Sequence, residues 1–383
     1  MAGVTRRDLL RMGVGGAVGL GGAHFLSSCG GKTPQSPTAA SAPTPAPLAE
    51  CSGVGPTPTA RVAAVRGSDL YDMTRGVLAA LGGISTVVKP GETVFIKPNM
   101  VTLPWASRDY NPFRLGECTK PEIVIAVAEE CLKAGAAEVI VGDGSQMPRF
   151  DWGGATTLDG STSLSREATR LSVAYDRRVS LACLDVDTPE WLLVPTGVSL
   201  GQVAVSSLVT RADRVISIPV AKTHKWAYLT LSLKNFIGIT PLERYGWATS
   251  SNHDRVLLHR NDSTPRGFGR LFVDLAKAAH PDLAIIDFSI GMEGDGPSLS
   301  SGGVTVDMRS RLGSWLLIAS TDPVAADSTA ARILNLESPY VGDLLTMASA
   351  AGMGTICEQS IELVGARLDD LRVSWRPAQV AGG

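Results

Sequence analysis

TVFIKPN (residues 93–99) and EVIVGDGS (residues 138–145) are the two stretches that decide the fold. Each is a short apolar run that ends in polar residues, which is typical of a strand buried on both faces of a sheet. Residues 122–134, between them, carry apolar side chains at helical spacing. The order of strand, helix and strand predicts two parallel neighbours joined by a helical crossover.

The same alternation continues along the chain. Further strands are expected at residues 61–66, 179–184, 214–219, 283–288 and 315–320. Further helices are expected at residues 70–81, 166–175, 271–279 and 324–334. We therefore predict an α/β fold, with a mostly parallel sheet and helices on both faces. Two short strands at 191–195 and 202–205 predict a small antiparallel insertion near 185–210.

The N-terminal residues 1–29 are predicted to be an export signal. Arg6 and Arg7 precede a glycine-rich, weakly apolar run, as in twin-arginine signals, and the run is too short to span a membrane. It ends at Cys29, in the position of the lipidated cysteine of a bacterial lipobox. We expect the twin-arginine export machinery and, through a lipid on Cys29, a membrane of the cell envelope as partners, with the protein on the periplasmic or other extracytoplasmic side.

Proline, threonine and alanine dominate residues 30–60, which predicts an extended linker. Residues 61–375 then form the predicted globular α/β domain. With 35 basic and 37 acidic side chains the chain has a net charge of −2, and no basic block stands out, so we expect no nucleic-acid partner.

The six cysteines show no spacing typical of a zinc site or an iron–sulfur cluster, so we expect no built-in cluster. Cys131 and Cys183 lie in apolar segments and are predicted core residues. Cys51 and Cys118 are the candidates for a disulfide in an exported protein.

Polar residues follow five of the predicted strands, where ligands of open α/β sheets bind. These residues are Lys97 and Asn99; Asp143 and Ser145; Lys222 and His224; Asp287, Glu293 and Asp295; and Asp322 with Asp327. Only 19% of the residues are charged, yet each of these five strand ends carries charged or amide groups. This coincidence predicts that the five ends form one common site.

Lysine and histidine together suit a small anionic ligand, because they supply donors and positive charge. Lys222, His224 and Lys234 are the candidate catalytic residues. The candidate substrate-binding residues are Lys97, Asn99, Asp143, Ser145 and Asn235. A structural histidine is the alternative for His224, and residues 229–234 fit either a strand or a helix.

The segment GMEGDGP (residues 291–297) is predicted to be a tight loop. It sets Glu293 and Asp295 among glycines, so both carboxylates could ligate a divalent metal such as magnesium or calcium. A turn with solvated acids is the alternative. Asp322 precedes Pro323 and is predicted mainly as the N-cap of the following helix.

The motifs IKPN (96–99), GDGS (142–145), KTH (222–224), LKN (233–235), GMEGDGP (291–297) and STDPVAAD (320–327) occur in this order. In this the chain resembles the family called domain of unknown function 362, over roughly residues 60–335. The resemblance implies that the motifs form one site and supplies no substrate. Two functions remain open: an enzyme acting on a small anion, with or without a metal, or a non-catalytic accessory lipoprotein that binds a ligand or cofactor.

Overall fold

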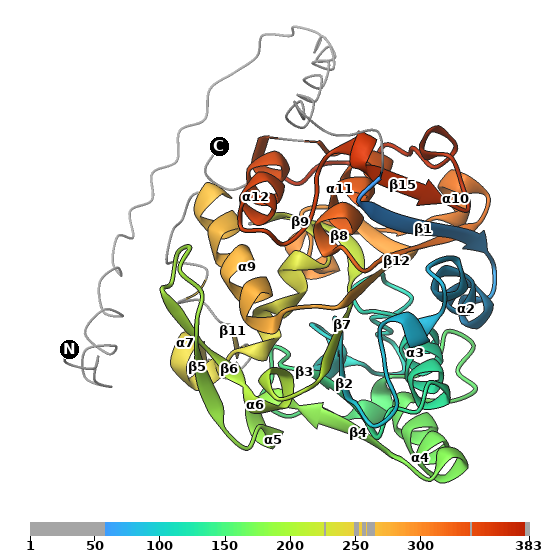
Figure 1. Ribbon diagram of the computed structural model, residues 1–383, viewed down its shortest axis with the longest axis vertical. Coiled ribbons are helices and arrows are strands. Elements are labelled where there is room, and N and C mark those ends of the chain that lie inside the picture. The colour runs from blue at the N-terminus through green and yellow to red at the C-terminus, as the bar shows by residue number, and fades with distance from the viewer. Residues whose placement is uncertain are drawn as a thin grey trace, which may run out of the picture. The chain divides into compact units, whose positions relative to one another are not determined.

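The computed structural model describes residues 58–225, 227–248, 253–254, 258, 265–337 and 339–379. The predicted export signal, Cys29 and nearly all of the linker lie outside these residues. Figure 1 shows a central twisted sheet with helices on both sides. Within the described residues, no helix combines the length and the apolar character needed to cross a membrane.

The main sheet has the strand order β15-β1-β14-β12-β7-β2-β3-β4, and β8, β9 and β13 extend it beside β12. Its strands are β1 (Ala60–Gly67), β2 (Thr93–Pro98), β3 (Glu138–Asp143), β4 (Arg178–Cys183), β7 (Arg214–Ile218), β8 (Val220–His224), β9 (Tyr228–Thr230), β12 (Leu283–Gly294), β13 (Gly303–Asp307), β14 (Trp315–Ser320) and β15 (Ile361–Val364). Two hairpins stand apart, β5 (Trp191–Pro195) with β6 (Gln202–Ser206), and β10 (Trp247–Ala248) with β11 (His253–Asp254). The first hairpin is the predicted antiparallel insertion, so that prediction is confirmed.

Parallel pairing joins β4, β3, β2, β7 and β12 in sequence across the sheet. The predicted mostly parallel sheet is thereby confirmed. We call the edge formed by the C-terminal ends of these strands the carboxyl edge. β14 runs antiparallel to both of its neighbours, β1 and β12. Its C-terminal end therefore lies at the opposite edge of the sheet.

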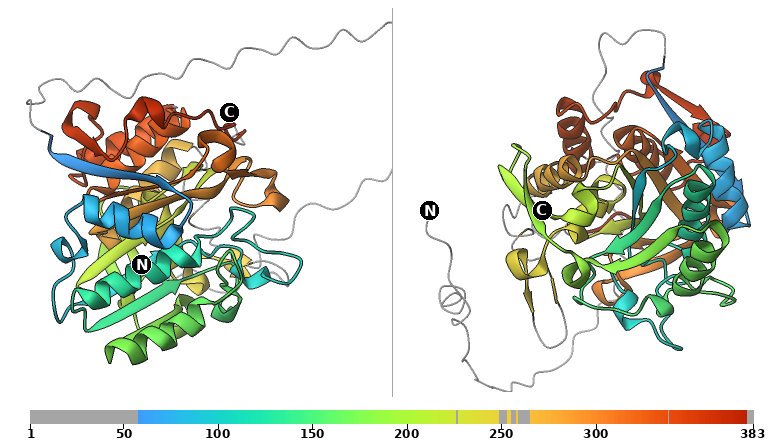
Figure 2. Two further views of the ribbon diagram at one scale, coloured as in Figure 1. Left: turned by 90° about the vertical axis from the view of Figure 1, so that its right-hand side faces the viewer. Right: turned by 60° about the horizontal axis from the view of Figure 1, so that its bottom comes forward.

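Helices cover both faces of the sheet. They are α2 (Leu70–Ala80), α3 (Pro121–Lys133), α4 (Leu164–Tyr175), α5 (Leu184–Asp187), α6 (Ser207–Thr210), α7 (Leu242–Tyr245), α9 (Pro265–Ala279), α10 (Arg309–Leu312), α11 (Pro323–Leu334) and α12 (Pro339–Ala350). Figure 2 (left) shows α2, α3 and α4 side by side on one face. On the other face, α9, α11 and α12 pack together with the 3-10 helix η4 (Leu233–Ile239).

Alternation along each strand divides the buried side chains between two cores. In β2, Val94 and Ile96 pack beneath α2 and α3, whereas Phe95 belongs to the core beneath α9, α11 and α12. Both faces of the strand are thus buried, which is why its sequence is a continuous apolar run.

One detail differs from the sequence predictions. Residues 291–294 continue β12 and pair with β13, so the tight loop predicted from residue 291 onward is wrong for them. A glycine is needed at 291 because a Cβ there would collide with the backbone oxygen of Ala221 in β8. After Pro219, residues 220–224 form a strand of their own, β8, which carries Lys222 and His224.

Candidate functional site

The carboxyl edge joins β2 to β3 through a buried ion pair. Lys97 Nζ, at the end of β2, lies 2.5 Å from Asp143 Oδ1, at the end of β3. Asp143 Oδ2 accepts a hydrogen bond from the backbone amide of Met100 at 2.7 Å. Ser145 Oγ donates to the backbone oxygens of Met100 and Val101, both at 2.8 Å. The predicted convergence of these strand ends is therefore present.

Asn235, on η4, reaches the same cluster from the other face of the sheet. Its Nδ2 donates to the backbone oxygen of Lys97 at 2.7 Å and to Ser217 Oγ at 3.2 Å. A backbone oxygen only accepts, so this contact fixes which end of the amide faces Lys97. Asn235 Oδ1 is buried without a hydrogen-bond partner in the described structure. The cluster thus has one unused buried acceptor.

Lys222, on β8, is fully buried. Its Nζ donates to the backbone oxygen of Glu117 at 2.6 Å and, more weakly, to Asn99 Oδ1 at 3.4 Å. Among the described residues, no carboxylate lies within ion-pair distance of this ammonium, whereas Lys97 has Asp143. Burial lowers the pKa of Lys222 to about 8.

A second buried ion pair lies nearby, at the start of α3. Lys120 Nζ is 3.2 Å from Asp287 Oδ2 on β12, and both side chains are fully buried. Lys120 also donates to the backbone oxygen of Ile290. Lys120 precedes Pro121, and in the sequence it reads as an ordinary polar residue before a helix. Sequence reasoning missed it because it does not follow a strand.

Glu117 was missed for the same reason, and it closes the site. Its carboxylate is fully buried and accepts hydrogen bonds from Thr102 Oγ1 at 2.6 Å, from the hydroxyl of Tyr110 and from the backbone amide of Leu299 at 2.8 Å. These bonds hold residues 99–117 against the end of Lys222, which contacts both ends of this segment. We call residues 99–117 the covering segment.

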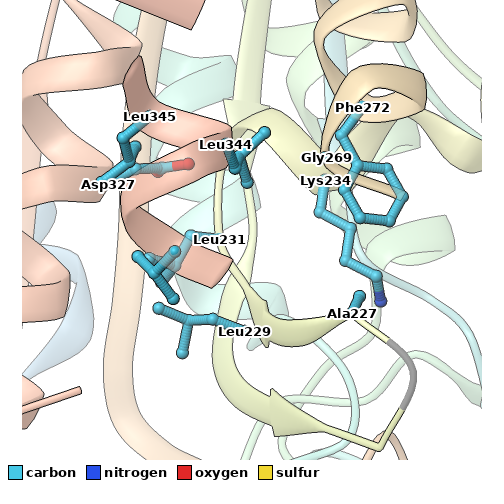
Figure 3. A pocket seen from close by; sticks show the side chains of 10 residues that line it. Ala227, Leu229, Leu231, Lys234, Gly269, Phe272, Asp327, Leu344 and Leu345 are labelled. Carbon is cyan, nitrogen blue, oxygen red and sulfur yellow. The ribbon is translucent and has the colours of Figure 1, made fainter. Parts of the chain in front are cut away.

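His224 and Lys234 lie differently with respect to Lys222. His224 is buried and stands two residues after Lys222 on β8, hence on the same face of that strand. Lys234 lies on η4, and its Nζ donates to Thr230 Oγ1 at 3.0 Å and sits 5.8 Å from the ring centre of Phe272. The two neighbouring residues therefore lie in different surroundings. Asn235 contacts the carboxyl edge, whereas Lys234 contacts Thr230 and Phe272 (Figure 3).

Glu293 and Asp295 have partners in the C-terminal segment. Glu293 Oε1 is 3.2 Å from a guanidinium nitrogen of Arg311, and its Oε2 accepts from the backbone amide of Arg376 at 2.9 Å. Asp295 Oδ1 accepts from the backbone amide of Gln379 at 2.7 Å. Within the described residues, no three histidine, cysteine or acidic side chains are grouped as metal ligands. A divalent metal at Glu293 and Asp295 stays a prediction.

Asp322 does not belong to the carboxyl edge. It follows β14, whose direction puts it at the opposite edge, so its inclusion among the five strand ends was wrong. Its Oδ1 accepts from the backbone amide of Ala325, as predicted for an N-cap, and its Oδ2 from that of Thr355. Asp327, one turn further along α11, accepts from Ser232 Oγ at 2.5 Å and from the Leu233 amide at 3.0 Å, and so fixes the start of η4.

The cysteines divide into buried thiols and a disulfide. Cys131 and Cys183 are free and buried, as predicted. Cys118 is also free and buried, so it is not the disulfide candidate that the sequence suggested. Cys357 is disulfide-bonded. Cys51, the other candidate, lies outside the described residues.

These observations define an α/β protein with a closed polar centre of buried lysines, acids and amides at the carboxyl edge of its sheet. The family model for the domain of unknown function DUF362 matches residues 94–332, and the chain belongs to this family. A thylakoid-associated protein of Synechocystis is 30% identical over 281 residues, which are 73% of this chain and 74% of that protein.

Two solved structures match the chain at low similarity. The lactate racemase apoprotein of Thermoanaerobacterium thermosaccharolyticum matches with 12% identity and a TM-score of 0.32, over 60% of this chain and 50% of that one. A protein of Thermotoga maritima matches with 11% identity and a TM-score of 0.37, over 75% of this chain and 60% of that one.

Proposed function

We propose that this protein is a membrane-associated, exported enzyme that acts on a small anionic ligand at the polar centre around Lys222. The observation that carries the proposal is the burial of the Lys222 ammonium without a carboxylate at ion-pair distance among the described residues. A buried charge of this kind costs stability, and such costs are concentrated at functional sites. An anion at Lys222 would supply the missing counter-charge.

The chemistry of Lys222 suits acid–base work. Since burial lowers its pKa to about 8, the amine exchanges a proton close to neutral pH. In its charged form it would stabilise negative charge that develops on a substrate oxygen. His224, on the same face of β8, is the candidate second proton carrier, and Lys97, Asp143 and Asn235 would hold the wall of the site.

Access to Lys222 requires the covering segment to move, because the side chain is fully buried. Of the three hydrogen bonds to the Glu117 carboxylate, two come from Thr102 and Tyr110, within the covering segment, and one from the Leu299 amide. None of these donors is a cation. Movement of the covering segment would break the bond from Leu299 and would expose the buried side chains of Met100 and Phe113, so access to Lys222 is a local unfolding event.

Thermal unfolding of the full chain with phosphate, sulfate, acetate and oxalate tests the proposal. An anion at 100 times its Kd should stabilise the protein by about 2.7 kcal/mol. We expect Lys222→Met to lose this stabilisation. Lys133→Met, at an exposed lysine on α3, is the matched control and should keep it. If no anion stabilises the wild type more than Lys222→Met, the proposal is wrong.

Turnover separates the enzyme from the accessory binding protein. The anion that stabilises most is incubated with the full chain and followed by NMR. New signals that are absent with Lys222→Met support the enzyme. Recovery of the unaltered anion favours the non-catalytic binding protein.

Export and lipid anchoring are part of the proposal. Arg6, Arg7 and Cys29 support it in the sequence, and the disulfide at Cys357 is typical of an oxidising compartment. The similarity to a thylakoid-associated protein supports membrane association. Fractionation of cells tests it: Cys29→Ser should move the protein from the membrane fraction to the soluble fraction, and an unchanged distribution would contradict the anchor.

A further inference from the structure

A pocket lies at the end of the main sheet, on the side of β15 that faces α11 (Figure 1). Its lining residues come from α11, from β15, from the segment that leads into the 3-10 helix η7 (Leu368–Asp370), and from Glu358 at the start of η6 (Glu358–Ser360). Its volume is about 300 Å³. Sites for small molecules span roughly 300–1,000 Å³, so a small organic ligand fits. None of the lining residues belongs to the polar centre around Lys222.

Apolar side chains form one part of the pocket wall. They are Ile361, Leu363, Ala366 and Leu368, and all four are partly exposed. Among the described strands, β15 pairs only with β1, and Ile361 and Leu363 lie on the same face of it. A compact hydrocarbon group in the pocket would remove this apolar surface from water.

Arg332, on α11, forms the buried polar part of the wall and is only 4% exposed. Its two terminal nitrogens donate to neutral acceptors, Ser328 Oγ at 3.2 Å and the backbone oxygen of Ile356 at 2.7 Å. Its Nε lies 3.4 Å from a carboxylate oxygen of Glu337 and equally far from one of Glu358. Burial nevertheless lowers the pKa of Arg332, so these two acids do not fully offset the burial of its charge.

Hydrogen-bond donors remain for a ligand at this wall. A guanidinium has five N–H groups, and the contacts of Arg332 use three of them. Thr329, one turn before Arg332 on α11, is also only 4% exposed, and its hydroxyl has no hydrogen-bond partner among the described residues. Both side chains can donate to an oxygen atom in the pocket.

The charges of the lining favour an anion. Arg367 is exposed and, in the described part of the chain, pairs with no acid. Glu358 is the one acid in the lining, and its side chain is 59% exposed and therefore largely hydrated. Two guanidinium groups thus face one carboxylate, so an anionic ligand is attracted and a cationic ligand is repelled.

We propose that this pocket binds a small organic monocarboxylate, with its hydrocarbon against the side chains of β15 and η7 and its carboxylate at Arg332 and Arg367. Both parts of the ligand are required, because the wall is apolar on one side and cationic on the other. The proposal is independent of the function of Lys222, since the two sites share no residue.

NMR titration of the full chain with phenylacetate, phenylethanol, phenethylamine and acetate tests this, because the first three probes differ mainly in charge and acetate lacks the ring. We expect phenylacetate to bind with a Kd of about 1 mM or below. The alcohol, the amine and acetate should each bind at least about tenfold more weakly. An absence of phenylacetate binding, or equal affinity for the alcohol, would overturn the proposal.

Arg367→Met should weaken phenylacetate at least about tenfold and leave phenylethanol unchanged. Arg61→Met is the matched control, because it removes an exposed arginine from β1, the strand next to β15, and this arginine does not line the pocket. It should keep the affinity of the wild type. Equal affinity for phenylacetate in the wild type and Arg367→Met, or equal losses in the two arginine variants, would contradict the proposal.

Ala366→Phe gives a second reading that does not depend on charge. Ala366 is partly exposed at the pocket wall, so a ring should be accommodated there, occupy the place of the ligand and abolish the binding of phenylacetate and phenylethanol. Full phenylacetate affinity in Ala366→Phe would place the ligand elsewhere and contradict the proposal. Lys222→Met should bind phenylacetate like the wild type, which keeps a failure here distinct from a failure of the proposed function.

Discussion

Lys222 Nζ donates to the backbone oxygen of Glu117 at 2.6 Å, and this neutral oxygen is its strongest contact in the described structure. Lys97, on a neighbouring part of the carboxyl edge, instead pairs with Asp143. Two buried lysines thus have different electrostatic surroundings. We therefore expect the replacement of Lys222 and the replacement of Lys97 to have different effects on the free energy of unfolding.

Lys222→Met is expected to change the free energy of unfolding at pH 7 by no more than about 1 kcal/mol, because the loss of two hydrogen bonds is offset by removal of a buried charge. Lys97→Met should cost about 3–5 kcal/mol, because it leaves Asp143 buried without its counter-charge. Urea unfolding of both variants measures this. Equal losses would mean that Lys222 is a structural residue.

The pH dependence of stability should reveal the lowered pKa of Lys222. Between pH 8 and 10.5 the unfolded chain keeps the proton that the folded chain releases, so the stability of the wild type relative to Lys222→Met rises with pH. The rise amounts to about 3 kcal/mol when complete. Urea unfolding at pH 7, 8, 9 and 10 measures it, and a flat difference would contradict the burial of a charged amine.

Tyr110→Phe should loosen the covering segment. The substitution removes one of the three donors to the buried Glu117 carboxylate, and a hydrogen bond to a charged group contributes about 1.5–3 kcal/mol. We expect N-ethylmaleimide to label Cys118, the residue directly after this segment, roughly tenfold faster than in the wild type. Mass spectrometry resolves the sites, and Cys131 serves as the internal control. An equal increase at Cys131 would indicate general destabilisation.

Asp327 should contribute a pH dependence of the opposite sign. Burial raises the pKa of Asp327 to about 7, so between pH 4 and 7 the folded chain binds more protons than the unfolded chain. The stability of the wild type relative to Asp327→Asn should therefore fall across this range, by about 4 kcal/mol at most. Thermal unfolding at intervals of half a pH unit measures it. A difference that rises with pH would show that the carboxylate is stabilised by its hydrogen bonds to η4.

The order of strands and helices was predictable because buried parallel strands have a recognisable sequence pattern. Segments such as 93–98 and 138–143 are short apolar runs followed by turn residues, and their length distinguishes them from buried helices. The direction of β14 was not predictable from the sequence, because an apolar run has the same pattern in a parallel and in an antiparallel strand. Asp322 was therefore assigned to the wrong edge of the sheet.

The site was predictable mainly where its residues come at the ends of the predicted strands. Lys97, Asp143 and Lys222 do so, and their convergence is a consequence of parallel pairing. Glu117 and Lys120 precede a helix, and a buried acid or lysine at such a position has the same sequence appearance as an exposed one. Lys234 and Asn235 lie in different surroundings because of the path of η4. That path was not predictable, because the periodicity of residues 229–234 fits either a strand or a helix.

Calorimetric titration of oxalate or phosphate into the full chain at pH 7 and pH 9.5 tests the central claim most directly. If Lys222 supplies the charge that holds the anion, binding occurs at pH 7, weakens at pH 9.5 as the amine loses its proton, and is absent at both pH values in Lys222→Met. Equal affinity for the anion at the two pH values, or in the variant and the wild type, would contradict the account.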